Sequence, residues 1–134
     1  MFDDNTMKEI VMLGAGSGIA PFRCFLQYIL DKKLSTKATL VYSNKTEEDI
    51  ICKQDFDEFN EQIKNFDCVH TLSREEKEGY KHGRIDEELI KELKKKHPNA
   101  FYFICGPPKM VSGTKEILLT CGIEKEKVKV EIYG

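Results

Sequence analysis

Two features that would point to a membrane or a nucleic acid are missing from this sequence. No apolar run approaches the length of a membrane-spanning helix, and the N-terminus has no signal-peptide pattern. The chain also has no excess of basic residues, because 21 basic and 23 acidic side chains leave a formal net charge of −2. A surface that binds nucleic acid or lipid headgroups would carry a clear positive excess. We therefore expect a cytoplasmic protein with neither a membrane span nor a nucleic-acid partner.

Paired cysteines are missing as well. No C-x-x-C pair occurs, and no cysteine has a histidine at the spacing of metal ligands. An odd number of scattered cysteines, mostly with apolar neighbours, is typical of reduced thiols in the cytoplasm. The sequence therefore predicts no metal site. The five cysteines are Cys24, Cys52, Cys68, Cys105 and Cys121.

What is present is the composition of a folded domain. The 134 residues are 40% hydrophobic and 33% charged, which is typical of a globular protein rather than a disordered one. A chain of this length can enclose one hydrophobic core. Because the sequence shows no repeat, low-complexity segment or linker, we expect residues 1–134 to form one domain.

A glycine-rich stretch follows the first apolar run. Ile10–Leu13 leads into Gly14–Gly18 (GAGSG), and an amphipathic segment follows from Pro21 to Lys33. The glycines let the backbone bend and leave N–H groups uncovered at a helix start, where the helix dipole favours an anion such as a nucleotide diphosphate. The G-x-G-x-G spacing differs from the G-x-G-x-x-G of the usual dinucleotide fingerprint. Taken alone, a tight turn without a ligand explains the stretch equally well.

Apolar runs and amphipathic segments alternate along the chain, and the alternation predicts the fold. The runs that predict strands are Lys8–Leu13, Ala38–Tyr42, Asp67–Leu72, Ala100–Cys105 and Val128–Tyr133. The segments that predict helices are Pro21–Lys33, the stretch after the capping-box pattern Thr46–Asp49, Ile85–Lys96 and Lys109–Thr120. Such alternation predicts an α/β fold, a three-layer, doubly wound, five-stranded parallel sheet in the order 3-2-1-4-5.

Two turns are expected to meet at one crevice of this sheet. Ligands of doubly wound sheets bind beyond the carboxyl ends of the strands, at the switch point between the first and fourth strands. Gly14–Gly18 and Cys105–Pro108 would both lie there, with Cys105 at the floor of the crevice. No histidine is placed to act as a base for Cys105, so a small apolar role is favoured over a nucleophilic one.

A long polar loop, Ser73–Arg84, begins at the same edge of the sheet. Loops of this length in small domains tend to be functional or mobile. Arg74 could bind a phosphate through two hydrogen bonds, or it could be a surface arginine. Tyr80 could stack on an adenine, or it could pack over the sheet. His70 and His82 are isolated in the sequence and are interpreted as structural or solvent-facing.

The two turns together resemble the nicotinamide-nucleotide-binding domain of the ferredoxin–NADP reductase superfamily, which includes cytochrome b5 reductases and the reductase components of bacterial oxygenases. Gly14–Phe22 and Cys105–Met110 carry the resemblance, which covers essentially the whole chain. Tyr42–Ile50 is similar to the cytochrome b5 reductase version of this domain. Leu72–Glu75 and Val130–Tyr133 are more similar to the plant-type version.

The resemblance implies a role in cofactor binding for thirteen positions. Four residues of the glycine turn, Gly14, Gly16, Ser17 and Gly18, would hold the pyrophosphate and border the nicotinamide. Gly106 would lie beside the nicotinamide, and Ser73 and Arg74 match the residues that bind the 2′-phosphate of NADP. Asn44 would lie on the ribose side. Tyr133 matches an aromatic residue that stacks on the flavin, although here Gly134 follows it. The thirteen are Gly14, Gly16, Ser17, Gly18, Ile19, Pro21, Asn44, Ser73, Arg74, Gly106, Pro107, Met110 and Tyr133.

Two further positions would take part in catalysis. The resemblance implies that Cys105 lies beside the nicotinamide and guides its C4 atom toward a flavin, and that Glu131 is a carboxylate near that flavin. Family members carry an FAD-binding barrel before this domain, and no such barrel occurs in residues 1–134. Because the barrel would cover this edge, we expect Cys105, Glu131 and Tyr133 to be partly exposed here.

The sequence thus supports one main hypothesis about function. The chain would be the NADH- or NADPH-binding half of a flavin-dependent oxidoreductase, passing hydride to FAD on a separate or removed domain, in cis or in trans. The alternative is a stand-alone nucleotide-binding module without redox turnover. A flavodoxin-like FMN protein is disfavoured, since the glycine turn is not a Ser/Thr-rich mononucleotide loop. The choice between the two nucleotides and the downstream electron acceptor stay open.

Overall fold

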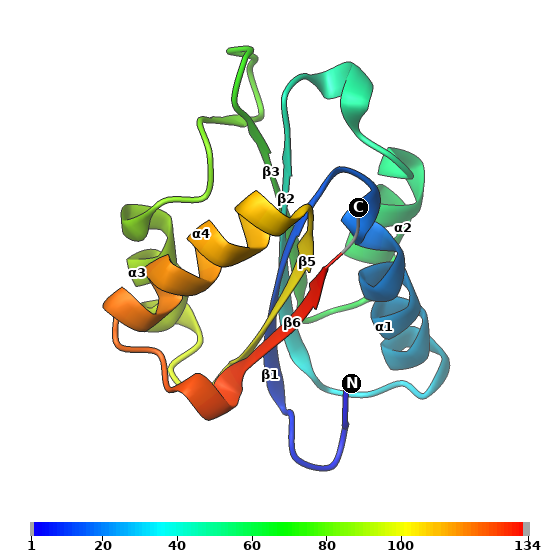
Figure 1. Ribbon diagram of the computed structural model, residues 1–134. Helices are drawn as coiled ribbons and strands as arrows, with labels where there is room; N and C mark the ends of the chain where they lie inside the picture. The colour runs from blue at the N-terminus through cyan, green and yellow to red at the C-terminus, as the bar shows by residue number, and fades with distance from the viewer. Residues whose placement is uncertain (1, 133–134) are drawn as a thin grey trace.

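Six parallel strands form one sheet in the order β4-β3-β2-β1-β5-β6 in the computed structural model, which describes residues 2–132. The strands are β1 Glu9–Ala15, β2 Lys37–Asn44, β3 Phe66–Leu72, β4 Lys81–His82, β5 Phe101–Gly106 and β6 Val128–Ile132. The helices are α1 Ala20–Asp31, α2 Lys53–Gln62, α3 Glu87–Lys96 and α4 Pro108–Thr120. Helices α1 and α2 cover one face of the sheet, and α3 and α4 cover the other (Figure 1).

The predicted sheet was right in its main strands and wrong in their number. The five expected strands are present in the expected order, but the loop Ser73–Arg84 contributes a sixth, β4. Strand β4 is only two residues long and pairs with Thr71 and Leu72 of β3. Two polar residues give no alternating pattern, so this strand exists through its pairing and not through its own sequence.

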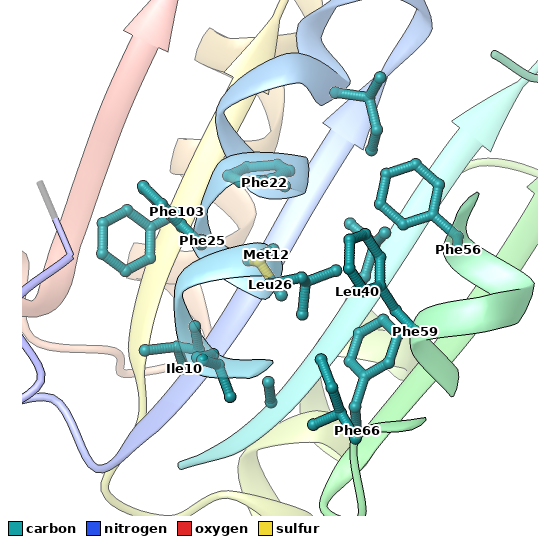
Figure 2. Packing of buried hydrophobic residues seen from close by; sticks show 14 of the residues in the cluster. Ile10, Met12, Phe22, Phe25, Leu26, Leu40, Phe56, Phe59, Phe66 and Phe103 are labelled. Carbon is teal, nitrogen blue, oxygen red and sulfur yellow. The ribbon is translucent and has the colours of Figure 1, made fainter. Parts of the chain in front are cut away.

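The core on the α1 and α2 side is rich in phenylalanine. Phe25 of α1 meets Phe103 of β5 with ring centroids 5.0 Å apart, and Phe56 and Phe59 of α2 lie beside Leu40 of β2 (Figure 2). The opposite face buries aliphatic residues of α3 and α4 against the sheet. Both faces of the central strands are therefore covered, as the continuous apolar sequence of β1 requires.

The register of the strands places the glycine turn. Gly14 in β1 lies opposite Tyr42 of β2 on one side and Cys105 of β5 on the other. The chain then leaves β1 through a 3-10 turn, η1 (Gly16–Ile19), and enters α1. The turn therefore stands at the switch point of the sheet, as predicted. Within residues 2–132, no helix is long and apolar enough to cross a membrane.

Candidate functional site

A cleft of about 770 Å³ lies at the carboxyl end of the sheet, the edge where β1, β2, β3 and β5 end. Its volume falls within the roughly 300–1,000 Å³ that is usual for cofactor and small-molecule sites. The cleft is lined by Ala15, Gly16, Ser43, Asn44, Lys45, Asp49, Ser73, Arg84, Ile85, Pro107, Lys109, Met110, Gly113, Thr114 and Ile117. The structure thus brings five of the predicted cofactor-binding residues into one cleft: Gly16, Asn44, Ser73, Pro107 and Met110.

The glycine turn and the end of β5 touch at Gly18. A Cβ atom placed on Gly18 would lie 2.6 Å from the carbonyl oxygen of Cys105 and 2.8 Å from the Cα atom of Gly106. No side chain fits between the two backbones, so glycine is required for this close approach. Gly16 has a φ of +56°, in the left-handed region, and a Cβ atom there would meet nothing within 4 Å. The turn therefore presents bare backbone beside the cleft.

The turn after β5 leads directly into a second helix start. Pro107 is the N-cap residue of α4, and its side chain makes no capping hydrogen bond. The first N–H groups of a helix lack partners within the helix, and the helix dipole gives this end a partial positive charge. Since Pro107, Lys109 and Met110 all line the cleft, this end of α4 contributes positive potential to it.

Cys105 does not line the cleft, and its thiol is buried on the α1 side of the sheet. Its side chain is 1% exposed and belongs to the core cluster that contains Phe22 and Phe103, so the expectation of partial exposure was wrong. Burial, together with the nearby Glu131 carboxylate, raises the pKa of Cys105 to about 12. The thiol is therefore protonated near neutral pH, which agrees with the apolar role favoured from the sequence.

Cys105 and Glu131 lie together in a second, smaller cavity. The two residues pair across β5 and β6, and both line a space of about 140 Å³ on the α1 side of the sheet. Phe22, Phe25 and Phe103 form much of its wall. The Glu131 side chain is exposed, as expected. Tyr133 lies outside the described residues.

The loop Ser73–Arg84 folds down onto the segment after β2. Lys77 forms a salt bridge of 2.8 Å with Glu47, and the Tyr80 hydroxyl donates a hydrogen bond to the same carboxylate. The Tyr80 ring also lies 5.9 Å from the ring of His70. The Tyr80 ring thus packs against β3, and its stacking on an adenine stays a prediction.

Ser73 and Arg74 differ in their relation to the cleft. Ser73 lines it, and its backbone N–H donates to the carbonyl oxygen of Asn44 at 3.0 Å. Arg74 is exposed and is not among the lining residues. Its predicted contact with a 2′-phosphate would require its side chain to turn toward Ser73, so that role stays a prediction.

The side-chain amide of Asn44 is buried and lies close enough to the Tyr42 hydroxyl to act on its pKa. Its side chain is 7% exposed, and within the described residues its Nδ2 atom has no hydrogen-bond acceptor. An unsatisfied buried amide costs about 1–3 kcal/mol, so an acceptor on a bound ligand would relieve it. Asn44 lines the cleft, but its Nδ2 atom has almost no exposed surface, so a hydrogen bond from this atom to a ligand stays a prediction.

Three cations of the cleft were missed by the sequence analysis. Lys45 follows β2, Arg84 ends the long loop, and Lys109 lies in the first turn of α4. None of the three forms a salt bridge within residues 2–132. The position of Lys109 directly after Cys-Gly-Pro-Pro was a usable signal. The place of Arg84 depends on the φ of +111° at Gly83, which the sequence does not reveal.

Residues 12–116, most of the chain, match the family described as the oxidoreductase NAD-binding domain. The chain belongs to this family. The predicted resemblance to the nucleotide-binding domain of the ferredoxin–NADP reductase superfamily is thereby confirmed.

Curated relatives of this NAD-binding domain are longer proteins. The chain is 30% identical to NADH-cytochrome b5 reductase 1 of Lodderomyces elongisporus over 94% of this chain and 43% of that protein. It is 35% identical to a nitrate reductase [NADPH] of Leptosphaeria maculans over 87% of this chain and 13% of that protein. The chain thus spans less than half the length of the relatives it matches.

A solved structure shares the fold closely. The CS-b5R domains of human Ncb5or in the NAD+ form superpose with a TM-score of 0.84 and 25% identity, over 97% of this chain and 39% of that one. The residues of the cleft fit the nucleotide that names the family. Bare glycine backbone, a helix N-terminus and three cations suit a pyrophosphate, and the unpartnered Asn44 amide suits a ribose hydroxyl.

Proposed function

We propose that this domain binds NADH or NADPH in the cleft and presents the nicotinamide to an FAD carried by a separate domain, so that the whole protein is a flavin-dependent oxidoreductase. The observation that carries the proposal is the contact of Gly18 with Cys105 and Gly106 beside the cleft. This contact joins an anion-binding turn to the end of the central strand β5. The dinucleotide would therefore be held at the pyrophosphate while its reactive ring lies near Cys105.

The side chains divide the binding between them. Lys109 and the N-terminus of α4 would neutralise the pyrophosphate, together with the N–H groups of the glycine turn. Asn44 would donate its amide to the ribose side. Cys105, buried and protonated, would offer a small uncharged surface beside the nicotinamide and would not react with it.

The redox chemistry would come from the cofactors, since NAD(P)H supplies a hydride, two electrons and a proton, and FAD accepts it. The contribution of this chain is orientation, because hydride transfer needs donor and acceptor atoms within about 3–3.5 Å. Glu131 and the small cavity beside Cys105 lie next to the place where the partner would dock. Several relatives support this division, since their names join a nicotinamide nucleotide to a reductase and their chains are longer than this one.

The test compares this chain alone with the chain joined to an FAD-binding barrel, either its own or that of a related reductase. We expect the chain alone to bind nucleotide and to leave NAD(P)H absorbance unchanged in the presence of a dye acceptor. Addition of the barrel should start turnover. Turnover by the chain alone would contradict the proposal. Binding without turnover in the natural whole protein would favour the stand-alone nucleotide-binding module instead.

A further inference from the structure

Tyr42 connects the glycine turn to the segment that follows β2. Its side chain is fully buried, with its ring 6.2 Å from Phe56 and 6.0 Å from His70. The hydroxyl donates a hydrogen bond of 2.6 Å to the carbonyl oxygen of Gly16 and accepts one of 3.3 Å from the N–H of Ile51. A side chain that is held on both sides in this way has a fixed hydroxyl position, so it can fix the peptide to which it donates.

The peptide in question is the one between Gly16 and Ser17. In a trans peptide the carbonyl and the N–H of the next residue point in opposite directions. Tyr42 lies in the core on the α1 and α2 side and draws the Gly16 carbonyl toward that side. The N–H of Ser17 therefore points away from Tyr42, although Ser17 itself is not among the residues that line the cleft. Gly16 does line the cleft, together with residues of α4.

We propose that Tyr42 is a positioning residue of the nucleotide site: its hydroxyl holds the Gly16–Ser17 peptide so that the Ser17 N–H faces the cleft. This inference rests on the proposed function, because it assigns the N–H to the pyrophosphate of the bound nucleotide. The Gly16–Ser17 peptide needs this hydrogen bond because Gly16 has no side chain that restricts the backbone. Glycine adopts many backbone conformations at little cost, so the hydroxyl adds a restraint to the one that the 3-10 turn η1 itself supplies.

The opposite orientation of the same peptide would oppose binding. A rotated peptide would direct the Gly16 carbonyl, the negative end of a dipole, at a ligand that is itself negative. The Tyr42 hydroxyl remains a hydrogen-bond donor throughout the neutral range, since burial raises its pKa. The hydrogen bond from Tyr42 thus favours the orientation in which the turn presents an N–H group to a negative ligand.

The chain offers a matched control in Tyr102 of β5. Its side chain is 1% exposed, yet within residues 2–132 its hydroxyl has no hydrogen-bond partner. It lies in the core on the α3 and α4 side and does not line the cleft. Tyr42→Phe and Tyr102→Phe therefore remove the same atom from equally buried rings, and only the first removes a contact with the turn.

The experiment measures the dissociation constants of NADH and NADPH for the 134-residue chain and both variants by calorimetric titration. We expect Tyr42→Phe to weaken both nucleotides by the same factor, roughly three- to tenfold, as the loss of one neutral hydrogen bond implies. Tyr102→Phe should leave both constants unchanged. Unchanged binding by a folded Tyr42→Phe variant would overturn the proposal. A loss for only one nucleotide would also overturn it, because the pyrophosphate is common to both.

A second measurement separates this inference from the proposed function. If the wild-type chain binds neither nucleotide, the proposed function fails, but the effect of Tyr42 on the turn can still be read without ligand. Amide hydrogen exchange at Ile51 and in η1 should be faster in Tyr42→Phe than in the wild type and in Tyr102→Phe. Equal exchange in all three proteins would show that the hydroxyl does not hold the turn.

Discussion

The two ends of the sheet differ in whether the polar groups near the strand ends line a cleft. At the amino end, where the strands begin, side chains bond one another: Thr39 shares a hydrogen bond of 2.8 Å with His97, and Lys96 pairs with Asp67. At the carboxyl end, the Asn44 amide and the cations around the cleft have no such partners among the described residues. Buried polar atoms without a partner also occur at the amino end, where His97 Nδ1 and the Tyr102 hydroxyl have none within residues 2–132, but those residues do not line the cleft.

This difference predicts how substitutions should behave. Changes at the amino end should alter the free energy of unfolding and leave nucleotide binding intact, and changes at the carboxyl end should do the reverse. The clearest expected exception is the contact at Gly18, where the fold and the site use the same atoms.

The largest effect is expected from Gly18→Ala, which should change both the unfolding free energy and nucleotide binding. The new Cβ atom would lie 2.6 Å from the backbone carbonyl oxygen of Cys105, which cannot turn aside as a side chain would. The turn and β5 must separate, at a cost of about 1–3 kcal/mol of unfolding free energy. Nucleotide binding should be lost with it. Chemical denaturation and calorimetric titration measure the two effects.

Gly113→Ala is the matched control for stability. Gly113 lies within α4, and a Cβ atom there would meet nothing within 4 Å. Alanine at this position should raise the unfolding free energy by up to about 1 kcal/mol. If Gly18→Ala proved as stable as Gly113→Ala, the close approach of the two turns would not be a constraint.

The next largest effects are losses of nucleotide affinity when either of two arginines at the carboxyl end, Arg74 or Arg84, is replaced by alanine. Arg74→Ala should weaken NADPH roughly ten- to a hundredfold and spare NADH, if Arg74 binds the 2′-phosphate as the family resemblance implies. Arg84 already lines the cleft, so Arg84→Ala should weaken both nucleotides by roughly tenfold. Neither variant should change the unfolding free energy. If Arg74→Ala lost the same affinity for NADH and for NADPH, Arg74 would contact a part of the nucleotide that both share and not the 2′-phosphate.

How far the sequence predicts this molecule depends on the range of the interactions. Apolar runs and glycine turns are local signals, and they located five strands and the switch point. Strand β4 and the contact between Tyr42 and Gly16, 26 residues apart, depend on pairing across the fold. Arg84 was missed for the same reason, since its place follows from the backbone at Gly83 and not from its neighbours in sequence.

A pair of substitutions, one at each end of the sheet, tests the comparison most directly. Thr39→Val should lower the unfolding free energy by about 1–3 kcal/mol, because it leaves the buried Nε2 atom of His97 without a partner. Asn44→Leu removes an amide whose Nδ2 atom has no acceptor in the described chain, so stability should be kept or raised. Its nucleotide affinity should fall roughly two- to tenfold. Each variant is measured by its denaturation midpoint and by its nucleotide dissociation constants. If Thr39→Val and Asn44→Leu changed both quantities in the same direction, the division between the two ends would be refuted.

The smallest effect is a pH dependence that arises at the amino end. His97 is 4% exposed, and burial lowers its pKa below the ordinary value of 6.5, with Lys96 acting in the same direction. The unfolded chain therefore binds a proton at a higher pH than the folded chain does. Stability is fully present above about pH 6.5 and should decrease as the pH falls toward the lowered pKa of the folded state.

Two histidines contribute to this slope, and they belong to different regions. His70 in β3 also has a pKa lowered by burial, and its ring lies 6.0 Å from that of Tyr42. His97→Gln should flatten the acid side of the stability curve in part, and a variant that also carries His70→Gln should flatten it further. Since His97 is remote from the cleft, the dissociation constants of His97→Gln should match those of the wild type at pH 7.5. A loss of nucleotide affinity in His97→Gln would mean that the amino end of the sheet is coupled to the site.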